Sequence, residues 1–118
     1  MSTVQAYVHR AEVQLGGGDS GAPGAAVTTR LCGGWEHEGA CRWPHHTSVE
    51  GTAPLLVLRV VFVAEPGEEQ GVRRLVVEGL ASGTSAGPGG ESHWELLEEG
   101  PADLREDERG LGDRLSGV

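Results

Sequence analysis

The segment from Cys32 to His46 holds both cysteines of the chain and three of its five histidines. Thiolate and imidazole are the preferred ligands of zinc, and four of them close a tetrahedral site. Several glycines within the segment would permit the tight bends that a loop needs to wrap around an ion. The spacing therefore predicts a structural zinc site. Its proposed ligands are Cys32, His37, Cys41 and His45, with His46 as the alternate fourth ligand.

Two other interpretations of the cysteines stay open. Standard short zinc signatures begin with two cysteines separated by two to four residues, and this segment does not. Cys32 could instead pack as a small hydrophobic residue, as free cysteines often do, with the histidines exposed. A disulfide between Cys32 and Cys41 is the third possibility, and a reducing compartment would disfavour it.

A second hypothesis uses the carboxylates of the same segment. Glu36, His37 and Glu38, together with His45 and His46, could supply two imidazoles and one carboxylate. Such a set holds iron with open positions, or serves general acid–base chemistry near neutral pH. The alternative to a zinc module is therefore a small enzyme of a biosynthetic pathway. The sequence favours the ordinary interpretation that Glu36 and Glu38 only solvate a loop, because charged loop residues are the norm.

Residues outside this set bear on function as well. Trp35 and Trp43 could anchor a protein partner, because tryptophan is enriched where interfaces gain most of their energy. His9 falls on the core-facing side of a strand, where a histidine is usually hydrogen-bonded. Arg59 interrupts an apolar run, and a buried arginine needs a partner, for which a structural carboxylate is the better expectation.

Composition and charge limit the partners. The chain has 118 residues and a formal net charge of -9. This length fits a single domain, residues 1–118, and the negative charge argues against binding nucleic acid or an anionic membrane. The longest apolar run, Leu55 to Ala64, is half of what a membrane helix needs, and the N-terminus does not look like a secretory signal. We therefore expect a cytoplasmic protein whose partner is an unidentified protein or small molecule.

The hydrophobic pattern predicts the elements that would position this segment. His9 to Leu15 alternates as a half-buried strand, and Ala25 to Leu31 is predicted to pair with it as a hairpin. Leu55 to Ala64 is apolar on both faces, which indicates a central strand. A helix follows Glu65, and a short strand covers His93 to Leu97. A last acidic helix carries Leu104, Leu111 and Leu115 on one face.

These elements predict an α+β fold. We expect a mixed, mostly antiparallel four-stranded sheet with two helices mainly on one face, and flexible glycine-rich loops near residues 16–24 and 83–90. The central strand, the helix after it and the following strand would form a parallel crossover. The strand from His93 to Leu97 has few charges to protect an open edge, so a homodimer through this strand is expected.

Overall fold

The computed structural model describes residues 4–32, 43–87 and 90–115 of the chain. Its strands are β1 (Gln5–Gly17), β2 (His45–Thr52), β3 (Leu55–Ala64), β4 (Thr84–Gly87) and β5 (Gly90–Ala102). Its α-helices are α1 (Ala22–Cys32), α2 (Glu69–Ala81) and α3 (Glu106–Leu115), and a 3-10 turn, Pro66–Glu68, leads into α2. None of the helices in these ranges is long and apolar enough to cross a membrane.

The strands form one sheet in the order β2-β3-β1-β5-β4, and every pairing is antiparallel. The α+β class is confirmed, but the sheet has five strands rather than four and contains no parallel pair. β3 and β5 do run in the same direction, yet β1 lies between them, so the chain makes a split β-α-β arrangement. The predicted crossover between adjacent parallel strands is therefore wrong, because the first strand occupies the place between them.

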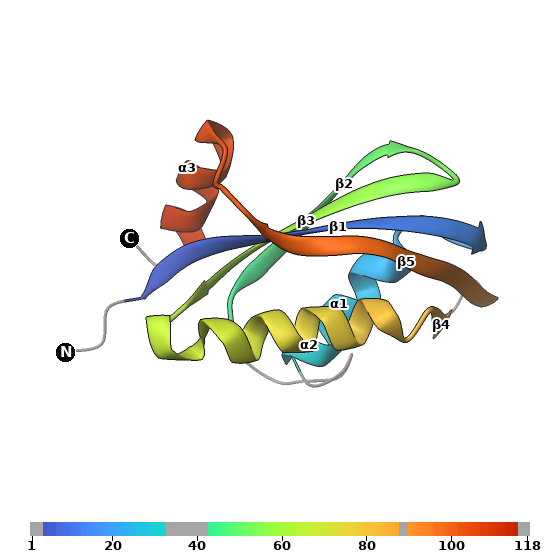
Figure 1. The fold of residues 1–118 in the computed structure, drawn as a ribbon, viewed down its shortest axis with the longest axis horizontal. Coiled ribbons are helices and arrows are strands. Elements are labelled where there is room, and N and C mark those ends of the chain that lie inside the picture. The colour runs from blue at the N-terminus through green and yellow to red at the C-terminus, as the bar shows by residue number, and fades with distance from the viewer. Residues whose placement is uncertain (1–3, 33–42, 88–89, 116–118) are drawn as a thin grey trace.

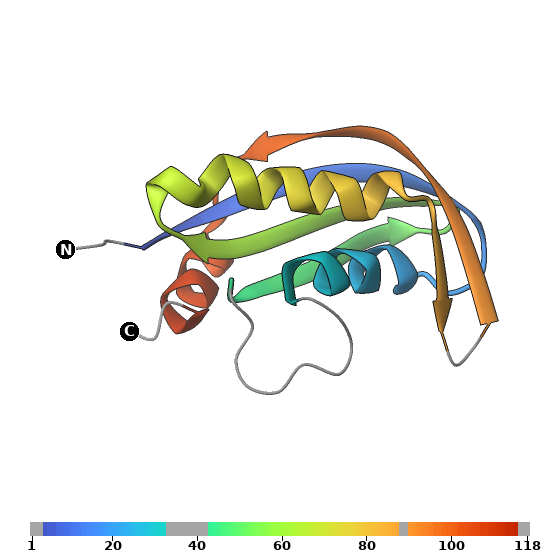
Figure 2. The same cartoon turned by 90° about the horizontal axis from the view of Figure 1, so that it is seen from below.

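Helices α1 and α2 lie side by side across one face of the sheet (Figures 1 and 2). The core between them and the sheet is aliphatic, with one buried phenylalanine, Phe62, and the indole of Trp94. The two helices approach closely at Gly79, where an added Cβ would lie 2.9 Å from the carbonyl oxygen of Ala26. Burial of this apolar face is the main stabilising term of the fold.

The third helix covers the opposite face of the sheet at one end (Figure 1). Val8, Val61 and Val63 are buried there although they point away from α1 and α2. Two helices on one face were predicted, and α3 on the other face corrects that arrangement. It also explains why the strand from Leu55 to Ala64 is apolar on both sides.

Several predicted elements are wrong or shifted. Residues 25–31 were expected to form a strand, but they lie within helix α1. β2 arises where an irregular loop was expected, and β4 forms within the second glycine-rich segment. The last strand is longer than predicted and includes Pro101. β1, β3, α2 and the final helix were identified correctly, apart from their ends.

Candidate functional site

The predicted zinc ligands are only partly placed by the structure. Cys32 is the last residue of α1, and its sulfur takes part in a disulfide. Cys41, which is the only other cysteine of the chain, lies outside the described residues, as does His37. Zinc binds cysteine as the thiolate, so a zinc site that includes Cys32 requires the reduced form of the protein.

His45 and His46 begin β2 and lie on opposite faces of the sheet. His45 pairs with Phe62, whose side chain faces α1 and α2, whereas His46 pairs with Val61 on the side of α3. Successive side chains of a strand alternate between the two faces. The structure therefore does not bring these two imidazoles together, although both were proposed for one site.

Both ring nitrogens of His45 have hydrogen-bonding partners. Its Nδ1 lies 3.1 Å from the carbonyl oxygen of Trp43, which can only accept, so Nδ1 carries the proton. Its Nε2 then accepts from the hydroxyl of Thr28 at 3.1 Å. Burial lowers the pKa of His45, and the nearby His46 lowers it further against the opposing effect of the Trp43 carbonyl. His45 is thus held neutral between α1 and β2.

No group of three or more metal-type side chains occurs within residues 4–32, 43–87 and 90–115. The structure does not test the carboxylate hypothesis, because residues 36–38 are outside these ranges. The two histidines that were to join them lie on opposite faces of the sheet. Zinc and iron binding both remain predictions that depend on residues 33–42.

The structure concentrates buried polar side chains elsewhere, around His9 on β1. His9 is 3% exposed, and its Nε2 lies 2.5 Å from Oε2 of Glu99 on β5. Nη1 of Arg73 on α2 lies 3.0 Å from the other ring nitrogen, Nδ1. Because arginine can only donate, Nδ1 accepts and Nε2 donates to Glu99. The expectation that His9 is a hydrogen-bonded core residue is confirmed.

Burial holds His9 in the neutral form. Desolvation is the main reason that its pKa is lowered, and the charge of Arg73 acts in the same direction. The carboxylate of Glu99 opposes this effect without reversing it. A second proton on His9 would also need a place on Nδ1, where the guanidinium already donates.

Arg73 is the centre of this network. Its side chain is 9% exposed, its Nε donates to Glu69 at 2.8 Å, and its Nη1 also donates to the carbonyl oxygen of Val8 at 2.8 Å. The guanidinium carbon lies 5.7 Å from the ring centre of Tyr7 and 5.3 Å from that of Phe62. Nη2 makes no hydrogen bond to any residue in the described part of the chain.

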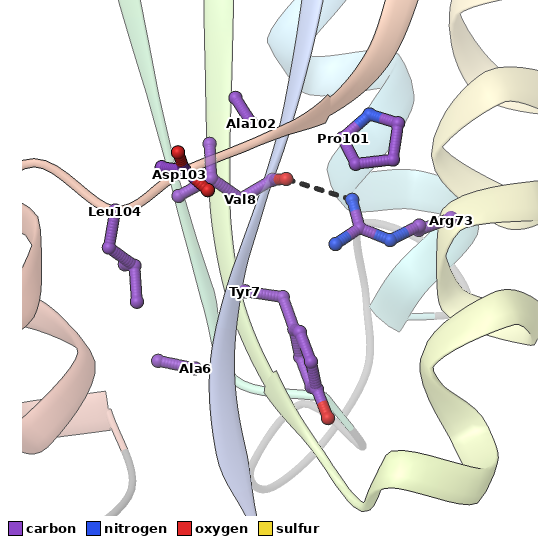
Figure 3. A pocket seen from close by; sticks show the side chains of 8 residues that line it. All are labelled: Ala6, Tyr7, Val8, Arg73, Pro101, Ala102, Asp103 and Leu104. Atoms are coloured by element: carbon purple, nitrogen blue, oxygen red, sulfur yellow. Dashed lines mark hydrogen bonds between the residues drawn. The ribbon is translucent and has the colours of Figure 1, made fainter.

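Two cavities meet at Arg73. The first, which we call the Tyr7 cavity, has a volume of about 320 Å³ and is lined by residues 6–8 and 101–104 together with Arg73. Figure 3 shows the guanidinium reaching from α2 to the space between Tyr7 and Pro101. The second, the Glu99 cavity, has a volume of about 410 Å³ and lies between α2 and β5, beside His9 and Glu99. Arg73 and Pro101 line both.

The charges around the Tyr7 cavity do not favour a second anion. Asp103 is at its rim, Glu69 already pairs with Arg73, and Glu99 lies on the other side of the guanidinium. Tyr7 stays protonated, because burial and the charge of Glu69 raise its pKa. The hydroxyl of Tyr7 donates to Oε1 of Gln5 at 3.3 Å, so the cavity offers a guanidinium donor and a carboxylate acceptor beside the aromatic ring of Tyr7.

A different buried ion pair is structural. Nε and Nη2 of Arg59 donate to the two carboxylate oxygens of Glu108, each at 2.7 Å, and Nη2 also donates to the carbonyl oxygen of Asp103 at 2.8 Å. Arg59 is the main cause of the lowered pKa of Glu108, and Glu108 raises the pKa of Arg59. The expected structural partner of Arg59 is confirmed, and this pair fastens α3 to β3.

Sequence reasoning missed Arg73, Glu69 and Glu99 as site residues. One signal was present, because Glu69 and Arg73 each precede a buried residue of α2, Val76 and Leu80 respectively, by two helical turns. Both therefore fall on the stripe of α2 that faces the sheet. A charge on an inward stripe needs a partner, as Arg59 does. Glu99 gave no such signal, because it lies among other exposed glutamates.

Family models, curated proteins and solved structures were all compared with this chain, and none matches it. The geometry around Arg73 is therefore the basis on which a function is proposed.

Proposed function

We propose that this protein is a small binding module that takes an uncharged polar ligand of the carboxamide type in the Tyr7 cavity. The observation that carries the proposal is the Nη2 group of Arg73, which makes no hydrogen bond to the described residues and is not among their fully buried unpaired atoms, so it is open to this cavity. A ligand oxygen can therefore replace solvent as the acceptor of this N–H group.

The surrounding groups support a neutral ligand. A carbonyl oxygen would accept from Nη2 of Arg73, and an amide N–H could donate to the carboxylate of Asp103 at the rim. A carboxylate ligand would instead meet the negative charge of Asp103 and Glu69, in a chain of net charge -9. The ring of Tyr7 provides an apolar surface for the rest of the molecule, and the volume is at the lower end of the usual range for ligand sites.

Arg73 is well prepared for this role. Glu69, Val8 and His9 fix its other nitrogens, so its side chain loses little freedom when a ligand binds. The two aromatic rings near its guanidinium carbon add to this restriction. Preorganisation of this kind favours affinity because the ordering cost has been met during folding.

A titration with three probes of similar shape tests the proposal. Benzamide, benzoate and benzylammonium differ in charge, and binding is followed by amide chemical shifts of residues 6–8 and 102–104. Benzamide should perturb these resonances at lower concentration than either charged probe. Tighter binding of benzoate, or no perturbation by benzamide, would contradict the proposal.

Two variants make the test specific to the site. Arg73→Lys removes Nη2 and should weaken benzamide binding at least tenfold, whereas Arg74→Lys, on the exposed side of α2, should not. Leu104→Trp fills part of the Tyr7 cavity and leaves Arg73 unchanged. It therefore tests the same site if Arg73→Lys is poorly folded. Unchanged binding in both Arg73→Lys and Leu104→Trp would exclude the site.

A cytoplasmic location belongs to the proposal as well. The cytoplasm keeps most thiols reduced, whereas Cys32 is disulfide-bonded in the structure. The location and the redox state of Cys32 are therefore linked, and cell fractionation combined with thiol labelling tests both.

A further inference from the structure

Strand β2 forms one edge of the sheet, and Gly51, near its end, has a positive φ of 91°. It pairs with β3 from His45 to Thr52 without any shift of register. The pairing of β1 with β5, in contrast, shifts twice. Regular edge strands are open to pairing with another chain unless something blocks them.

The outward backbone groups of β2 can be assigned from one hydrogen bond. The amide of Val63 donates to the carbonyl oxygen of Pro44 at 3.0 Å, in line with the β2–β3 register. Hydrogen-bonded pairs alternate in an antiparallel ladder, so even-numbered residues of β2 bond to β3. The N–H and C=O groups that point away from β3 to the edge of the sheet therefore include those of Thr47 and Val49.

The side chains of β2 offer little protection for this edge. Glu50 is its only Asp, Glu, Lys or Arg, it contains no proline, and Val49 is 41% exposed. The stretch of β5 that extends beyond β4 carries three glutamates and a proline. Charges and prolines are common means of blocking edge pairing, so β5 is protected and β2 is not.

A homodimer through residues 93–97 was expected from the sequence. β4 pairs with β5 only as far as His93, so residues 95–97 also lie at an open edge, but the three glutamates and the proline of β5 disfavour pairing there. We infer instead that two copies of this chain associate through β2, in an antiparallel pair whose two-fold axis passes at Ser48. In this register Thr47 faces Val49 of the partner subunit, so that the outward backbone groups of both chains meet. The two sheets would join into one.

The residue opposite Glu50 differs between this register and its neighbours. With the axis at Ser48, His46 stands opposite Glu50 of the partner subunit on the same face, and this occurs twice in a symmetric pair. An axis at Glu50 would set two carboxylates opposite each other, and an axis at Thr47 would leave Glu50 opposite Pro44 of the partner subunit. Arg105 donates to Glu50 at 2.6 Å and holds this carboxylate at the edge. A ring N–H of His46 can donate to the carboxylate of Glu50 in this register, whereas like charges across strands disfavour pairing.

Sedimentation equilibrium of the full chain tests the association. A dimer should be present at micromolar concentration. Val49→Pro removes an outward N–H that the β2–β3 ladder does not use, so the fold should survive while dimerisation weakens at least tenfold. Circular dichroism checks the fold. A wild-type protein that remains monomeric at several hundred micromolar would overturn the inference.

A matched pair of variants tests the role of charge. His46 is exposed, so His46→Glu and His46→Lys should both fold. The glutamate would face Glu50 of the partner subunit and should dissociate the dimer, whereas the lysine should preserve it. Equal dimerisation of the two variants would exclude the proposed register, even if Val49→Pro folds poorly.

Disulfide trapping then locates the axis. Residues that face each other in a non-hydrogen-bonded pair have Cα atoms about 4.5 Å apart, within the range for a disulfide. Ser48→Cys should form a covalent dimer under mild oxidation, and Thr52→Cys, away from the axis, should not. The opposite pattern of cross-linking would place the contact elsewhere and overturn the inference.

Discussion

Two buried arginines serve different purposes in this protein. Both donors of Arg59 that face Glu108 are used in a bidentate pair, and the pair joins two elements. Arg73 is also bound to a carboxylate, but one of its nitrogens stays directed to a cavity (Figure 3). Buried ion pairs contribute little net stability on average, although breaking one is costly. The unused donor of Arg73 is open to this cavity, which supports the binding role proposed above.

The neutral state of His9 predicts how stability depends on pH. Its pKa is lowered in the folded chain, so the unfolded chain takes up the proton first as the pH falls. The contribution of His9 is complete above the unfolded pKa of about 6.5 and is lost as the pH falls toward the folded pKa. The free energy of unfolding should thus decrease as the pH is lowered from about 7.5 to about 5.5, a window that spans the unfolded pKa.

Urea titrations of two variants measure how much of this pH dependence comes from His9. His9→Gln cannot titrate, so its free energy of unfolding should change less across this pH window than that of the wild type. Some dependence should persist, because burial lowers the pKa of His45 in the same direction. His93→Gln is the control, since the His93 side chain is 60% exposed. An unchanged pH dependence in His9→Gln would contradict the assignment.

At the scale of elements, the sequence identified those with a strong apolar period. β1, β3 and α2 have clear alternation or helical spacing, and they form the centre of the fold. Residues 25–31 were misread because Val27, Thr28 and Thr29 are β-branched and favour strands, although Val27 and Leu31 also have helical spacing. The sequence of β2 shows no alternation of apolar and polar residues, because a polar strand at the edge of a sheet needs no apolar face. Tertiary contacts determined both elements.

The close approach of α1 and α2 gives a prediction with an internal control. Gly79→Ala would place a methyl group 2.9 Å from the carbonyl oxygen of Ala26, and overpacking of this kind costs about 1–3 kcal/mol. Gly71 lies on the same helix with nothing within 4 Å of an added Cβ, so Gly71→Ala should add up to about 1 kcal/mol through helix propensity. Denaturant titration measures the change in the free energy of unfolding for each variant. If Gly79→Ala stabilised the protein as Gly71→Ala is expected to, the helices would not be in contact at Gly79.

At the scale of the whole molecule, the candidate site shows the limit of sequence reasoning. The residues of the zinc hypothesis are close in the sequence, which is why they could be named. His9, Arg73 and Glu99 come from three separate elements, and only the split connectivity brings them together. Single-residue signals such as a charge on an apolar stripe could mark Arg59, Glu69 and Arg73, but they could not show that His9 and Glu99 join Arg73.

The redox state of the chain links the zinc hypothesis to the structure. With Cys32 in a disulfide, the oxidised protein should bind no zinc, and the reduced protein should bind about one equivalent if the prediction is right. Elemental analysis of both forms, purified without chelator, gives the answer. Cys41→Ser should lose the metal. Less than about a tenth of an equivalent in the reduced wild type would refute the zinc hypothesis, since a structural site would be nearly full.

The position of β1 has a consequence for how the chain is made. Among the described strands, β1 is translated first, yet it lies between β3 and β5, and its pairing with β5 extends to Ala102. Domains generally fold as units during synthesis, and contacts between distant segments form late. The nascent chain must therefore keep β1 without its second neighbour until β5 has been translated. A ribosome stalled before residue 90 would carry a chain in which β1 can pair with β3 but not with β5, because β5 has not yet been made.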